Sequence, residues 1–147
     1  MNGNQLRQIL MHDEFTRNGF MGVYASDQIP LNYIPARRPV MFVANTAPSN
    51  HPGQHWVAFF YPTAGSPEFF DSFGKSPSYD RFTFQPFKYN KKGLQSFDSD
   101  VCGYYVLLYL LQRSRGITMQ EITSQFTNNR DCNDLAVTHF MEGYNLK

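Results

Sequence analysis

A single cysteine, Cys102, lies where a polar stretch of the chain gives way to a long apolar one. Gln95 to Asp100 precede it, and Gly103 and the apolar run YYVLLYLL follow it. We expect Asp100 to cap a buried helix that carries Cys102 in its first turn. The N-terminus of a helix bears partial positive charge and free N–H groups, which favour a thiolate over a thiol. Since the thiolate is the nucleophilic form, the position favours a reactive cysteine, with a buried core cysteine as the alternative.

A thiolate nucleophile needs an imidazole as its base, and the imidazole needs an acceptor that orients it. His55 is the best-placed histidine because it opens the apolar segment HWVAFFYP, where a strand can aim the ring. Asp71 lies near the exit of the next strand candidate, and a hairpin over TAGS would bring both residues to one end of the ribbon. They share a face only in a register such as Val57 opposite Asp71. The other histidines lie on predicted helices or in a turn-rich stretch: His12, His51 and His139.

Gln95 offers a second group that acyl transfer uses. It precedes Cys102 across a polar loop that can fold back, so its side-chain N–H can lie beside the backbone N–H of Cys102. Two such donors stabilise the oxyanion that forms when a nucleophile attacks a carbonyl. An exposed loop glutamine is the alternative. Gly103 leaves room beside the sulfur for the backbone of a substrate.

The segments between the N-terminus and Cys102 favour extended structure. A short amphipathic helix over 5–13 comes first, followed by an extended, turning segment in GFMGVYASDQIP. Composition and turn residues then favour β-strands in four segments: 39–47, 55–62, 67–73 and 81–89. Pro86 restricts the last of these to an edge of the sheet.

Helical signals dominate from Cys102 onward. The apolar run predicts a buried helix that ends near Gly116, and Thr118 with Glu121 forms a capping box that opens another. A last helix is expected over about 133–144. This order of elements is α+β: we expect a mixed or antiparallel sheet of about four to five strands, packed against a buried central helix with flanking helices.

Composition limits the class of protein. The 147 residues are 41% apolar and 17% charged, typical of one folded domain over residues 1–147, and the net charge of +1 argues against non-specific nucleic-acid binding. Cys102 and Cys132 have neither zinc spacing nor a disulfide framework, so we expect reduced thiols and interpret Cys132 as structural. The first residues do not resemble a signal peptide and the longest apolar run is too short for a membrane helix, which predicts a soluble protein without a membrane partner.

The ordered segments HWVAFFYP, FFDSFG and LQSFDSDVCGYYVLLYLL resemble the adenovirus-type cysteine endopeptidase (adenain-like) family. That family belongs to a clan shared with proteases of ubiquitin-like proteins, and the resemblance covers roughly residues 18 to 113. It implies a thiol protease that cleaves viral structural precursors, typically after Gly, as a hydrolase of virion maturation. By this resemblance Cys102 is the nucleophile, His55 the general base, Asp71 its orienting partner and Gln95 the oxyanion donor.

The resemblance also bears on partners and location. It implies protein substrates and action in the host nucleus or cytoplasm and in the virion, as in short relatives from virus-like mobile elements or small DNA viruses. Adenoviral relatives are activated by a disulfide-linked viral peptide and by DNA. This chain is shorter, Cys132 has no matching motif and the charge is near neutral, so we expect no cofactor.

Three other functions stay open at this stage. A deubiquitinase or an isopeptidase for a ubiquitin-like modifier would use the same fold and the same residues. A pseudoenzyme or a non-catalytic interaction module is the second alternative, although a decayed site usually loses at least one of its groups. Metal catalysis is the weakest, because Cys102, His55 and Asp71 lack helix-based ligand spacing.

Overall fold

The computed structural model describes residues 1–50 and 54–144. Within them a five-stranded mixed sheet has the spatial order β1-β2-β3-β4-β5, with β1 and β5 parallel to their neighbours and the central pairs antiparallel. Its strands are β1 (Phe20–Tyr24), β2 (Val40–Asn45), β3 (Trp56–Tyr61), β4 (Glu68–Phe70) and β5 (Lys88–Tyr89). The predicted α+β class is confirmed.

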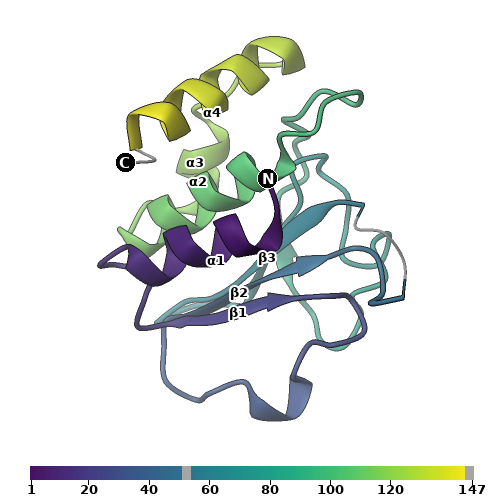
Figure 1. Cartoon of the computed structure of the whole chain (residues 1–147), viewed down its shortest axis with the longest axis vertical. Helices are drawn as coiled ribbons and strands as arrows, with labels where there is room; N and C mark the ends of the chain where they lie inside the picture. Colours follow the sequence, from purple (N-terminus) through teal and green to yellow (C-terminus); the bar gives the residue numbers. More distant parts are fainter. Residues whose placement is uncertain (51–53, 145–147) are drawn as a thin grey trace.

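The α-helices lie together on one face of the sheet (Figure 1). They are α1 (Gly3–His12), α2 (Cys102–Ser114), α3 (Met119–Thr123) and α4 (Arg130–Tyr144), and a short 3-10 helix, η1 (Leu31–Tyr33), lies in the loop before β2. Most of the side chains of α2 are buried, because α2 packs against β3 on one side and against the other three α-helices on the rest of its surface. This is the buried central helix that the apolar run predicted.

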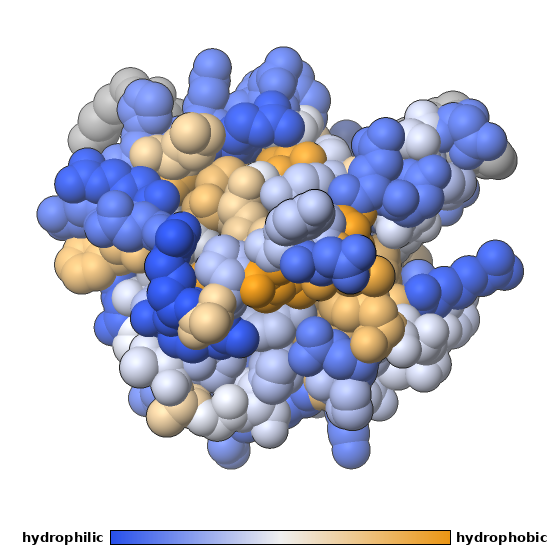
Figure 2. All heavy atoms as spheres, turned by 90° about the horizontal axis from the view of Figure 1, so that it is seen from below, coloured by the Kyte–Doolittle hydropathy of each residue, from blue (hydrophilic) through white to orange (hydrophobic). Residues whose placement is uncertain are grey.

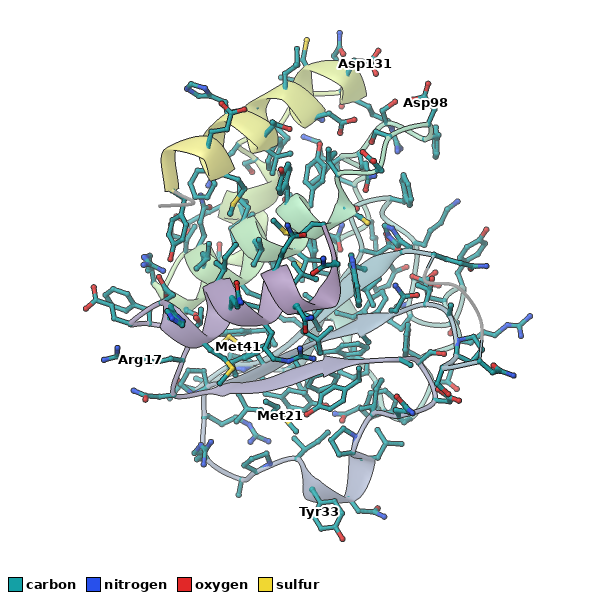
Figure 3. The ribbon with its side chains drawn as sticks, in the orientation of Figure 1. Arg17, Met21, Tyr33, Met41, Asp98 and Asp131 are labelled. Carbon is teal, nitrogen blue, oxygen red and sulfur yellow. The ribbon has the colours of Figure 1, made fainter. Side chains whose placement is uncertain are left out.

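Successive side chains of each strand point to opposite faces of the sheet, and here both faces are apolar. On β3, Ala58 and Phe60 pack toward the helices, whereas Phe59 and Tyr61 pack on the opposite face. Figure 3 shows the same division, with Met41 on the helix side of the strands and Met21 on the other. The helix-side core holds α2 rigidly, and through α2 it fixes the position of Cys102.

The face away from the α-helices is covered by loops, one of which carries η1. Its core is aromatic, with Phe42, Phe59 and Phe69 at 0% exposure and Phe82 at 3%. Figure 2 views the molecule from this side and shows apolar residues gathered near the middle, with hydrophilic residues around them. The loop between β4 and β5 is held here because Phe82 inserts its ring beside Phe59 and Phe69.

A polar contact fastens α2 to the sheet. The buried Glu68 of β4 accepts hydrogen bonds from the hydroxyl of Tyr109 and from two nitrogens of Arg113, at 3.0 and 2.9 Å for the guanidinium. A bidentate arginine–carboxylate pair fixes the rotation of the helix as well as its position. Among the described residues no helix is both long enough and apolar enough to cross a membrane.

Two strand predictions need correction. The segment 81–89 forms a strand only at Lys88–Tyr89, because its first half is a turn anchored by Phe82 and because Pro86 cannot donate to a ladder. The segment expected to be extended and turning contains the edge strand β1, which pairs with β2 in an irregular register. The glycines of this segment interrupt the residue pattern typical of a strand, so the sequence did not predict a strand there.

Helix boundaries also differ from the prediction. The N-cap of α2 is Val101, which makes no side-chain cap hydrogen bond; the exposed Asp100 lies too early to cap the helix. α4 begins at Arg130, ahead of the predicted start, because the side chain of Asn129 accepts a hydrogen bond from the N–H of Cys132. The capping box of Thr118 is present as predicted.

Candidate active site

Cys102 is the first residue of α2 and is only 9% exposed. The start of β3 lies against this turn, and the backbone N–H of Trp56 donates a hydrogen bond to the sulfur, as does that of Gly103. The side chain of His55, the residue before β3, makes a further hydrogen bond with the thiol. The packing of α2 on β3 therefore brings together a sulfur and an imidazole that are distant in the sequence.

The β3–β4 hairpin adopts the register that His55 and Asp71 require. Ala58 lies opposite Phe70, so the same register, carried one residue further, places Val57 opposite Asp71 and meets the condition stated above. The two side chains meet diagonally, and Nε2 of His55 lies 2.8 Å from Oδ1 of Asp71. That contact leaves Nδ1 as the ring nitrogen available to Cys102.

The pKa values of the groups at this site shift in the directions that favour an ion pair. Burial by itself lowers the pKa of His55, but hydrogen bonds to Asp71 and Cys102 and the charges of both raise it to about 9. Burial raises the pKa of the Cys102 thiol, yet the His55 hydrogen bond, the Trp56 amide and the imidazolium charge bring it below its usual value. Both shifts therefore favour a thiolate–imidazolium pair over a neutral pair.

Two residues that the sequence analysis did not identify hold Asp71 and His55 in place. The buried Asn90 accepts a hydrogen bond from the N–H of Asp71 at 3.1 Å and donates one to its carbonyl at 2.7 Å. Phe73 stacks its ring on that of His55, with 4.6 Å between centroids, and its N–H donates to Oδ1 of Asp71 at 2.8 Å. The register that the contact requires would have identified Phe73, since Phe73 then faces His55 across the hairpin, whereas no sequence signal marks Asn90.

Gln95 is buried beside the same sulfur-bearing turn. Its Oε1 accepts a hydrogen bond from the hydroxyl of Ser72 at 2.5 Å, and its Nε2 donates to the carbonyl and the hydroxyl of Ser99, both at 3.1 Å. Arg130 donates to the backbone carbonyl of Gln95 at 2.8 Å. The amide is thus held by its oxygen with its nitrogen directed along the loop that leads to Cys102.

The space beside Gly103 is filled differently from our expectation. A Cβ atom at Gly103 would lie 3.1 Å from Cβ of Met1, so the first residue of the chain packs against this turn. The indole N–H of Trp56 donates to the carbonyl of Met1 at 3.1 Å. Figure 1 shows the N-terminus beside the start of α2. Trp56 therefore anchors Met1 as well as supplying its amide to Cys102.

These groups border one open cleft of about 480 Å³. Cys102, His55, Gln95 and Trp56 line it, and so do Phe73 and Phe97. A cleft that exposes a sulfur, an imidazole and an amide together can admit an extended acyl substrate.

The remaining candidates lie elsewhere. His12 and His139 are exposed, and His51 lies outside the described residues. Cys132 is exposed on the first turn of α4, so its interpretation as a structural cysteine is wrong: the side chain packs into no core. The described residues contain no group of three His, Cys, Asp or Glu side chains arranged to hold a metal ion.

Comparison with known proteins finds similarity among solved structures alone. No protein-family model and no curated sequence matches the chain. Among solved structures it is similar to the crystal structure of the selenomethionine ASFV pS273R protease, at 23% sequence identity and a TM-score of 0.44. The match covers 71% of this chain and 47% of that one, so the chain spans about half the length of the protein it matches. The function proposed next rests on the geometry of the site.

Proposed function

We propose that this chain is a cysteine endopeptidase whose nucleophile is Cys102. One observation carries the proposal: the His55 ring contacts the Cys102 thiol on one side and the Asp71 carboxylate on the other, in an open cleft. A sulfur, a base and an orienting acid in contact form the constellation of thiol proteases, which is recognised by geometry and not by sequence position.

The chemistry follows from the protonation states. The Cys102 thiolate attacks the carbonyl carbon of a peptide bond, and the imidazolium of His55 gives its proton to the departing amine. A water molecule, deprotonated by the now neutral imidazole, then hydrolyses the thioester and regenerates the thiolate. Asp71 holds Nε2–H of His55 throughout, so that Nδ1 stays directed at the reacting atoms.

The oxyanion would be stabilised by the amide of Gln95 and the backbone N–H of Cys102. The first N–H groups of a helix have no intrahelical acceptor, so they are free to donate to a substrate oxygen. Support for Gln95 comes from its burial, its anchorage to Ser72 and its place on the wall of the cleft. On binding, its Nε2–H would exchange its contact with Ser99 for one with the oxyanion.

For the substrate, we propose structural precursor polypeptides of a virus or a virus-like element, cut after Gly. The support is the order of His55-Trp56, Asp71, Gln95 and Cys102-Gly103, which resembles the adenovirus-type pattern. Action in the host nucleus or cytoplasm and in the virion would follow from such a substrate.

A cleavage-site profile tests the proposal. Purified protein is incubated with a proteome-derived peptide library, and new termini are identified by mass spectrometry against a Cys102→Ala control. We expect cleavage by the wild-type protein alone, enriched after Gly. A profile without Cys102-dependent termini, from protein whose thiol still reacts with iodoacetamide, would exclude peptidase activity.

The same purified protein can be used to distinguish an endopeptidase from the alternative function on this fold. A deubiquitinase or ubiquitin-like isopeptidase should form a covalent adduct between Cys102 and a ubiquitin-like vinyl sulfone probe. Peptide cleavage without this adduct supports the endopeptidase, and adduct formation without peptide cleavage supports the isopeptidase.

A further inference from the structure

Asp71 has one carboxylate oxygen that the site geometry leaves unexplained. Its Oδ1 accepts hydrogen bonds from His55 and from the N–H of Phe73. Its Oδ2 is fully buried, and no N–H or O–H group of the described residues donates to it. A buried carboxylate oxygen without a donor is costly, so a fold rarely retains one.

Asp80 supplies the missing partner. Among the described residues, just one other buried side-chain oxygen or nitrogen lacks a hydrogen-bond donor or acceptor, and that atom is Oδ2 of Asp80. The two carboxyl groups act on each other's pKa, so they lie close together, and each has one buried oxygen without another partner. Two ionised carboxylates are both acceptors, so such a contact exists only if one of them carries a proton.

The surroundings decide which carboxyl holds that proton. Burial favours the neutral form of Asp71, but His55, the Asp80 hydrogen bond and the Phe73 amide lower its pKa. For Asp80, burial, the hydrogen bond to Asp71 and the charge of Asp71 raise the pKa to about 8, against the opposing charges of His55 and Lys75. At neutral pH Asp71 is the carboxylate and Asp80 is the acid.

The chain holds Asp80 in this position through a closed turn. The N–H of Asp80 donates to the carbonyl of Ser76 at 3.2 Å, and that of Phe82 donates to Pro77 at 2.8 Å. Arg81 has a φ of 69°, in the left-handed region, and Phe82 enters the aromatic core. A residue between two such anchors has little freedom to move away from Asp71.

We propose that Asp80 is a positioning residue of the site: as a neutral carboxylic acid it donates its proton to Oδ2 of Asp71, and so fixes the carboxylate that orients His55. The expected effect of Asp80 on turnover rests on the proposed peptidase function. The hydrogen bond from Asp80 to Asp71 does not depend on that function. Asp80 does not line the cleft, so it acts on turnover and not on substrate binding.

Two substitutions separate donation from packing. Asp80→Asn keeps an N–H donor of the same shape, whereas Asp80→Ala removes the donor. At pH 7 we expect Asp80→Ala to lower kcat by about 10- to 100-fold with KM unchanged, by analogy with residues that orient metal ligands, and Asp80→Asn to stay within about threefold of wild type. Equal loss in both variants, or no loss in either, would overturn the proposal.

The pH profile gives a second measurement. In the wild-type protein kcat should decline as the pH rises through about 8, because Asp80 then ionises and repels Asp71. Asn cannot ionise, so Asp80→Asn should keep its activity up to the loss of the His55 proton at about 9. Identical alkaline midpoints in the two proteins would contradict a protonated Asp80.

A last experiment does not depend on catalysis. In ¹⁵N-labelled protein the Nε2–H proton of His55, held by Asp71, should give a sharp downfield NMR signal in the wild type and in Asp80→Asn. The signal should broaden or disappear in Asp80→Ala, with the circular dichroism spectrum unchanged. This signature would survive if the peptidase function were wrong, and its persistence in Asp80→Ala would disprove the positioning role even in an active enzyme.

Discussion

The first turns of α2 and α4 each carry a cysteine, Cys102 and Cys132. Cys102 is buried against β3 and contacts an imidazole and two backbone N–H groups, whereas Cys132 is exposed. A helix N-terminus contributes about 0.3–1 kcal/mol to a nearby negative charge, less than the 1.36 kcal/mol that one pKa unit represents. The difference shows that a helix terminus alone does not make a cysteine nucleophilic. Cys102 is activated because the sheet brings His55 to its sulfur.

The largest expected effect is that of removing the buried thiol. Cys102→Ala should reduce kcat on the best profiled peptide by about 10⁴-fold or more, because no other group can form the thioester. Cys132→Ala is the matched control and should stay within about twofold of wild type. Comparable losses of kcat in the two variants would contradict the claim that Cys102 alone is the nucleophile.

The second effect concerns what activates Cys102. His55→Gln keeps much of the side-chain volume but removes the base, so kcat should fall by about 10³- to 10⁴-fold. Alkylation of Cys102 by iodoacetamide at pH 7 should also slow, by about tenfold for each unit that the thiol pKa regains. Alkylation of Cys132 in the same sample should not change, which makes it an internal standard.

The pH dependence of alkylation sharpens this comparison. Because His55 lowers the pKa of the Cys102 thiol, alkylation of Cys102 should persist as the pH falls below the usual range of a cysteine pKa. In His55→Gln the rate of Cys102 alkylation should instead decline as the pH falls through the usual range of a cysteine pKa. Identical pH curves for Cys102 in the two proteins would mean that the imidazole does not activate the sulfur.

The third effect separates activation from oxyanion stabilisation. Gln95→Ala should lower kcat by about 10²-fold, the usual cost of one oxyanion donor, while alkylation of Cys102 stays at the wild-type rate. Ser99→Ala removes a hydroxyl that contacts Gln95 but leaves the amide in place, and should cost less than tenfold. A slower alkylation in Gln95→Ala would assign Gln95 to the thiol environment instead.

The sequence predicted the parts of this site that depend on local pattern. The buried helix α2 and the β3–β4 hairpin followed from periodicity and turn residues. The register of the hairpin was only a condition for contact between His55 and Asp71, and the structure meets it. The contact between α2 and β3 is tertiary, so the meeting of Cys102 and His55 was only a hypothesis that their residue types suggested.

Loop conformation limited the rest of the prediction. Asn90 and Asp80 both reach Asp71 from segments without regular structure, and their positions depend on anchors such as Phe82 and not on spacing. Asp100 was misassigned as a cap because residue preference does not fix the backbone position at which a helix begins.

The smallest expected effect tests what the first turn of α4 contributes to the cleft. Phe97 lines the cleft and is 71% exposed, with its ring stacked 5.8 Å from that of Phe73 and the guanidinium of Arg130 at 4.3 Å. Figure 3 shows the loop of Phe97 and the start of α4 at one corner of the molecule, marked by Asp98 and Asp131. Arg130 thus supports a residue of the cleft wall, although neither Arg130 nor Cys132 lines the cleft itself.

An aromatic ring held open to a cleft by two neighbours can bind an apolar side chain of the substrate. We expect Phe97→Ala to raise KM by about tenfold, equivalent to roughly 1.4 kcal/mol of lost contact, with kcat within about twofold. Leu135→Ala, at a position of α4 that is 73% exposed and outside the cleft, should leave both constants unchanged. If Phe97→Ala lowered kcat and Cys102 alkylation together, its ring would support His55 through Phe73 and would not contact the substrate.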